Sequence, residues 1–221
     1  MASREARALL RLLQLFDSQF PIGAFAHSGG VETYAAEGAA LPELREILQS
    51  QIALGWGRTE LAAAWLAWQA AADPVQRGAL AAGVDAIKVI PASRDTSVRL
   101  GRRLIALVGR IHPALACHLV VDPPHHAIVV GAVARLLDVD RSPMLLAFAH
   151  SLAAGTLAAA TRCMPVSPAQ AQALLVEVHG ALAEACARVE RDPADSLWSS
   201  TPALDIRAHQ QTYLRTRLFQ S

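Results

Sequence analysis

An uncharged stretch of twenty residues, from Ser142 to Thr161, constrains the fold of this chain most strongly. Its length is close to what a helix needs to cross a bilayer, so it either spans a membrane or lies at the centre of a protein core. The stretch is interrupted by Pro143, His150 and Gly155, and most of its apolar residues are alanine, which is only weakly hydrophobic. We therefore expect a buried central helix with other helices packed around it.

The rest of the chain shows helical spacing between joints of proline and glycine. Gly55 and Gly57 mark a bend, and Asp73 before Pro74 is typical of a helix cap. Alanine and leucine supply much of the apolar content and favour helices, and no segment reads convincingly as a strand. We predict an all-α protein, one domain over residues 1–221, built as a bundle of roughly nine or ten helices. The other expected helices are 4–16, 31–36, 42–72, 74–90, 94–110, 113–120, 126–137, 167–191 and 202–218.

The charged and sulfur-containing residues exclude several classes of function. Twenty basic against nineteen acidic residues leave no excess charge for nucleic acid or an anionic membrane. Lys88 is the only lysine and does not follow a GxxxxG motif, so the chain is not a P-loop NTPase. Three separate cysteines outside any CxxC pair suit reduced thiols, and the first residues show no signal-peptide core. We expect a cytoplasmic protein.

Histidines provide the main hint of catalytic or metal chemistry. No two of the eight are spaced i, i+4, the spacing that places two ligands on one helical face. His125 and His126 follow two prolines and either share a metal or begin a helix with an interface imidazole. His27 beside Ser28 resembles a base beside a nucleophile, although adjacency in sequence is not the geometry of a triad. A metal-dependent hydrolase that uses these three histidines with Glu32 is therefore one alternative.

The longest motif lies in residues 12–32. The sequence LLQLFDSQFPIGAFAHSGGVE resembles the UreF signature LxQLxDSxxPxGxFxHSxGLE, with Ala24 and Val31 as small departures. Residues 93–104, residues 125–139 and the ending RLFQS are similar to further UreF blocks, so the resemblance covers nearly the whole chain. The chain is identified as a member of the UreF family of urease accessory proteins. Its signature residues are Asp17, Ser18, Pro21, Gly23, His27, Ser28, Gly30 and Glu32.

The resemblance implies a helical, non-catalytic chaperone that dimerises in the cytoplasm. Such a protein binds UreD (also called UreH) and recruits the GTPase UreG, which carries nickel to apo-urease and whose activity it modulates. The resemblance implies no catalytic, cofactor-binding or metal-binding residue, because the assembled complex handles the nickel. The resemblance also implicates the C-terminal tail in docking UreD. The partner-binding residues that it implies are Arg217, Leu218, Phe219 and Ser221. We expect Leu218 and Phe219 to be exposed in the free chain and covered by the partner.

One triplet near the ending departs from the family pattern. Many members carry Arg-His-Glu where this chain has Gln210, Gln211 and Thr212, and the sequence leaves open how the triplet is used. Besides the hydrolase, a helical scaffold unrelated to urease is the second alternative.

Overall fold

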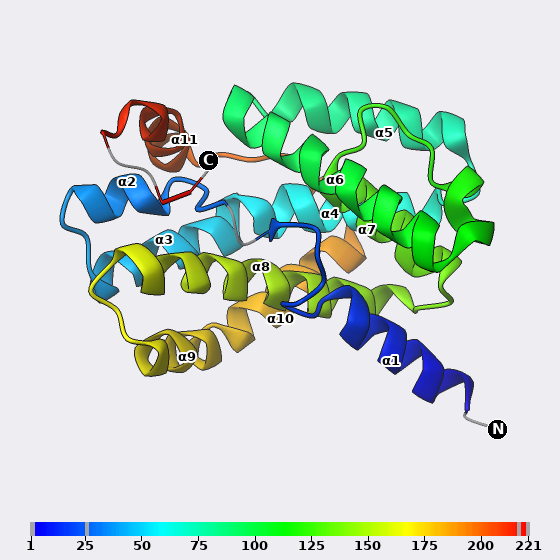
Figure 1. Cartoon of the computed structure of the whole chain (residues 1–221), viewed down its shortest axis with the longest axis horizontal. Helices are drawn as coiled ribbons and strands as arrows, with labels where there is room; N and C mark the ends of the chain where they lie inside the picture. The colour runs from blue at the N-terminus through cyan, green and yellow to red at the C-terminus, as the bar shows by residue number, and fades with distance from the viewer. Residues whose placement is uncertain (1–2, 25–26, 216–217, 220–221) are drawn as a thin grey trace.

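The computed structural model describes residues 3–24, 27–215 and 218–219. Within these residues it contains helices and no strand, which confirms the all-α prediction. Figure 1 shows the helices stacked side by side, with α1 extending from one corner of the molecule. The α-helices are α1 (Arg4–Leu15), α2 (Val31–Ala36), α3 (Leu41–Leu54), α4 (Trp56–Gln69), α5 (Pro74–Ile87), α6 (Pro91–Ile111), α7 (His126–Leu136), α8 (Arg141–Cys163), α9 (Pro168–Glu177), α10 (His179–Arg191) and α11 (Pro202–Gln210). Two 3₁₀ turns are η2 (Pro113–His118) and η3 (Gln211–Tyr213).

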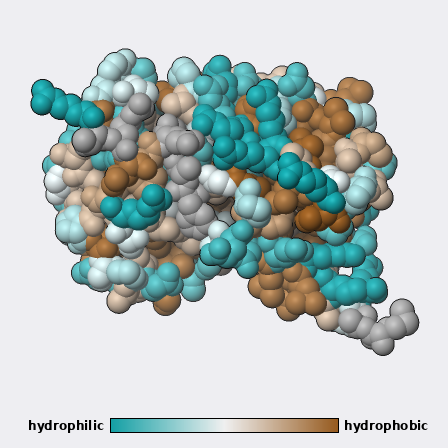
Figure 2. Space-filling view, in the orientation of Figure 1, coloured by the Kyte–Doolittle hydropathy of each residue, from teal (hydrophilic) through white to brown (hydrophobic). Residues whose placement is uncertain are grey.

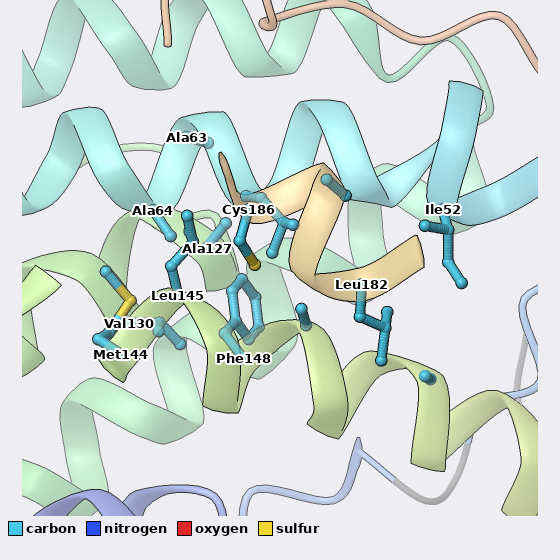
Figure 3. Packing of buried hydrophobic residues seen from close by; sticks show 14 of the residues in the cluster. Ile52, Ala63, Ala64, Ala127, Val130, Met144, Leu145, Phe148, Leu182 and Cys186 are labelled. Atoms are coloured by element: carbon cyan, nitrogen blue, oxygen red, sulfur yellow. The ribbon is translucent and has the colours of Figure 1, made fainter. Parts of the chain in front are cut away.

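The uncharged stretch forms α8, which lies in the core as expected. This helix is long and apolar enough to cross a membrane by length and composition, but it packs against α2, α4, α9 and α10. Phe148 is 1% exposed, and Figure 3 shows it pointing from α8 towards Cys186 of α10. The long apolar helix is thus a core helix of this bundle.

Helices α4 and α7 form the most extensive helix–helix contact in the bundle. Buried alanines cover the facing side of α4, and α7 is buried from Ala127 to Ala134. A Cβ atom on Gly131 of α7 would lie 2.1 Å from the backbone oxygen of Ala64, so only glycine fits at this crossing. Small side chains therefore let two backbones touch at the centre of the fold.

Two expected helices are each divided in the structure, and the expected 113–120 helix is the 3₁₀ turn η2 instead. The described residues therefore form eleven α-helices where the sequence suggested nine or ten. The 42–72 segment breaks at Gly55 because α3 and α4 approach closely there, and a Cβ atom on Gly57 would lie 2.1 Å from the oxygen of Ile52. The 167–191 segment breaks at Val178, two residues before Gly180. The Asp73 cap is confirmed, since its carboxylate accepts hydrogen bonds from the Val75 and Gln76 amides.

Helix α1 presents a row of exposed leucines at the edge of the molecule. Leu9, Leu10 and Leu13 are between 55% and 64% exposed, and Figure 2 shows apolar surface where α1 lies. The opposite face is anchored, because Arg11 donates a hydrogen bond to the Leu137 carbonyl and Phe16 packs against Phe148.

Candidate functional site

The family-like motif and the end of the chain meet in space. We call residues 17–32 the signature loop and residues 202–219 the C-terminal segment. Helix α2, which begins inside the signature loop, packs against α11 (Figure 1). Gly30 makes this approach possible: its φ is +95°, and a Cβ atom there would lie 3.0 Å from the Ala208 amide nitrogen. The signature loop is therefore shaped to receive the C-terminal segment.

Gln211 fastens the two segments together through buried hydrogen bonds. The Ser28 hydroxyl donates to Gln211 Oε1 at 3.0 Å, and Gln211 Nε2 donates to Glu32 Oε2 at 2.8 Å. The second Glu32 oxygen accepts a hydrogen bond from the Leu218 amide. Gln211 is 1% exposed and Glu32 is 6% exposed, so water does not replace these bonds readily. We call Ser28, Glu32, Gln211 and the Leu218 amide the clasp.

A second set of contacts joins α2 to α11 at the edge of the clasp. The Thr33 hydroxyl donates to the Arg207 carbonyl at 2.8 Å. Arg207 reaches back to α2, where its guanidinium lies 2.8 Å from a Glu37 oxygen and 5.4 Å from the ring centroid of Tyr34. These contacts align the two helices along their length.

The tail residues differ from one another in exposure. Leu218 is 62% exposed, as expected for a docking residue. The expectation that Phe219 is exposed is wrong: it is 4% exposed, and its ring lies 4.4 Å from the Arg162 guanidinium at the end of α8. The chain itself covers this apolar side chain, so no partner is needed to hide it. Arg217 and Ser221 lie outside the described residues.

The eight signature residues fall into distinct positions. Asp17, Ser18 and Pro21 are exposed at the start of the loop. Gly23 has a φ of +79° beside Arg103 of α6. The other four, His27, Ser28, Gly30 and Glu32, face the interior, and the last three meet the C-terminal segment. Gln211 belongs to the triplet that departs from the family pattern, and its burial and its bonds to Ser28 and Glu32 were not predicted, because a glutamine carries no signal of burial in the sequence.

A cavity of about 330 Å³ lies beside the clasp. The signature loop contributes His27 and Gly29, and the other walls include parts of α4, the α5–α6 junction, α6, the start of α7 and α11. Lys88 forms an ion pair with Glu60 in this wall, and each side chain is only 12% exposed. Burial lowers the pKa of His126 to about 4, and burial together with Arg99 and Arg103 lowers the pKa of His27 to about 4. Both imidazoles are thus neutral at pH 7.

The structure does not assemble the residues of the hydrolase alternative. Nδ1 of His125 lies 3.2 Å from the Ser97 hydroxyl and its Nε2 lies 3.3 Å from Asp85, whereas the His126 ring packs edge-on against Phe148. Glu32 is engaged in the clasp. In the part of the chain that the structure describes, no group of three or more His, Cys, Asp or Glu side chains is arranged to hold a metal ion.

Comparisons with known proteins identify the family of this chain. The UreF family model matches residues 42–179. The urease accessory protein UreF of Actinobacillus pleuropneumoniae is 32% identical, over 95% of this chain and 97% of its own length. The UreF proteins of Haemophilus influenzae and a Nostoc species are 30% and 28% identical, and each comparison covers at least 95% of both chains. The Haemophilus influenzae match covers 99% of this chain and so includes both halves of the clasp, which lie outside the residues matched by the family model.

Proposed function

Because this chain belongs to the UreF family of urease accessory proteins, we propose that it is a non-catalytic assembly factor for urease. It acts as a cytoplasmic dimer that binds UreD (UreH) and the GTPase UreG together. The resulting complex inserts nickel into apo-urease. The chain carries no cofactor of its own, and the nickel is handled by the complex.

The clasp is the observation that supports this role most directly. It builds one surface from the signature loop and the C-terminal segment, which are 183 residues apart where Ser28 meets Gln211. Three apolar side chains of the C-terminal segment that the clasp holds are exposed: Ile206 at 53%, Tyr213 at 75% and Leu218 at 62%. Exposed apolar and aromatic side chains held on a rigid frame are typical of a protein-docking surface. The clasp supplies that frame.

Bridging can be tested by pull-down with tagged UreD. We expect UreD to retain UreG only when this chain is present. Leu218→Arg places a charge on the docking surface and should weaken retention of the chain by UreD. Val75→Arg is the matched control, because Val75 is 80% exposed on α5 and belongs to neither segment of the clasp. Equal retention of UreG with and without the chain would refute the bridging role.

We also propose that the chain modulates UreG by positioning it in the complex. An arginine supplied in trans is one means of doing so, because it can stabilise charge in phosphoryl transfer. The test is the GTP turnover of UreG with UreD, measured with and without this chain and then with single Arg→Ala variants. A turnover that no addition or substitution changes would rule out this part of the proposal.

A further inference from the structure

Two histidines from different helices lie side by side at the surface of the bundle. His150 is in the middle of α8 and His179 is the first residue of α10, and these two helices pack against each other. Both side chains are exposed, and the centroids of their rings are 6.2 Å apart. Because the two residues belong to different helices, the i, i+4 spacing of a single helix does not reveal the pair.

The ring nitrogens of both residues are available to a ligand. Among the residues that the structure describes, no hydrogen bond or ion pair joins either ring to another group, and the contact between the rings themselves is a ring contact alone. The neutral form of an imidazole carries a nitrogen lone pair that can bind a metal ion. The two rings therefore present two metal-binding nitrogens at one place on the surface.

The separation of the rings suits one shared ion. A histidine nitrogen binds a metal at about 2.0–2.1 Å, so two imidazoles on one ion have centroids about 5–6.5 Å apart, depending on the angle at the metal. The observed 6.2 Å lies within this range. The helices hold the two backbones, and rotation of the exposed side chains about their χ angles can aim a nitrogen of each ring at the same point.

The donor atoms select the class of ion. Imidazole nitrogens suit Zn²⁺, Ni²⁺ and Cu²⁺, whereas Mg²⁺ and Ca²⁺ prefer oxygen ligands. Glu177 is the acid nearest to His179 in the sequence, and both of its oxygens already accept hydrogen bonds from Arg45. Val178 both ends α9 and begins α10, so the carbonyl end of α9 offsets the positive start of α10 beside the ion.

We propose that His150 and His179 together bind one divalent transition-metal ion of the class of Zn²⁺ and Ni²⁺. Two protein ligands are fewer than a structural zinc site has, so water completes the coordination of the ion. Such an ion exchanges with the solvent and is not a resident cofactor. The site lies on α8 and α10, outside the clasp, and neither bridging nor the modulation of UreG depends on it.

The test is calorimetric titration of the purified full-length chain, without a histidine tag, with ZnCl₂, NiCl₂ and MgCl₂. We expect Zn²⁺ and Ni²⁺ to bind and Mg²⁺ not to bind. His150→Gln and His179→Gln should each weaken Zn²⁺ binding about tenfold or more, and the double variant should lose little further, because the ion needs both rings. His150→Cys should still bind Zn²⁺, since a thiolate is also a zinc ligand. His209→Gln is the matched control on an exposed histidine of α11 and should bind like the native chain.

Three results would overturn the proposal. The first is that neither Zn²⁺ nor Ni²⁺ binds the native chain. The second is that His150→Gln and His179→Gln, shown to be folded by circular dichroism, bind Zn²⁺ like the native chain. The third is that His118→Gln, which removes an exposed imidazole beside Cys117, abolishes the binding instead. The test needs neither UreD nor UreG, so its outcome is independent of the bridging role.

Discussion

Replacing Gln211 with alanine should open the clasp without unfolding the bundle. The substitution removes the acceptor of the Ser28 hydroxyl and one donor to the Glu32 carboxylate, both in buried surroundings. A neutral hydrogen bond contributes about 1 kcal/mol and one to a charged group about 2 kcal/mol. Their sum of about 3 kcal/mol corresponds to an increase of about a hundredfold in the open population of the C-terminal segment.

Hydrogen exchange measured by mass spectrometry resolves this local opening. Peptides that cover α2 and α11 should exchange faster in Gln211→Ala, whereas peptides from α4 and α7 should keep the native rates. Gln210→Ala is the matched control, because Gln210 is exposed and contacts only Arg207 among the described hydrogen bonds. If both variants exchange alike over α2 and α11, Gln211 does not hold the segments together and the reasoning fails.

Three further predictions concern stability and reactivity. Gly30→Ala should lower the free energy of unfolding, measured in urea, by about 1–3 kcal/mol, because position 30 has a positive φ and a Cβ atom there would clash with the α11 backbone. Position 29 also has a positive φ but lies in open space, so Gly29→Ala should lower the free energy of unfolding by less. A larger loss for Gly29→Ala than for Gly30→Ala would contradict the close approach of the signature loop to α11. The free energy of unfolding should fall as pH drops from 6.5 to about 4, because His126 stays neutral in the folded chain while the same residue in the unfolded chain takes up a proton. In urea titrations at several pH values, His126→Gln should reduce the dependence of the free energy of unfolding on pH. An unchanged dependence would exclude His126 as its source. In the native chain a maleimide should label exposed Cys117 far faster than Cys186, whose burial raises its thiol pKa to about 12; equal labelling, read by peptide mapping, would show that α10 is not packed as described.

Much of the fold could be predicted because its signals are local. The uncharged stretch of α8 identified the central helix, and the Asp73 carboxylate identified the start of α5. The joint at Val178 was missed although Gly180 lies two residues after it, because a single glycine inside a helical pattern is compatible with one continuous helix.

The candidate site was predictable only in part. The motif located the signature loop, but its contact with Gln211 spans 183 residues, and no periodic pattern reports such a pairing. Phe219 shows the same difficulty, because the sequence does not reveal that Arg162 lies over its ring. Local patterns identified the segments, and tertiary contacts decided which faces they bury.

The most direct test of the central claim is urease maturation in cells that produce the native chain, no chain, or a chain truncated after Leu214. Urease activity, nickel content of urease and UreD pull-down are measured in parallel. We predict that truncation removes UreD binding and lowers both activity and nickel content to the level of cells without the chain. Full urease activity and nickel content without the chain would contradict its role as a urease assembly factor.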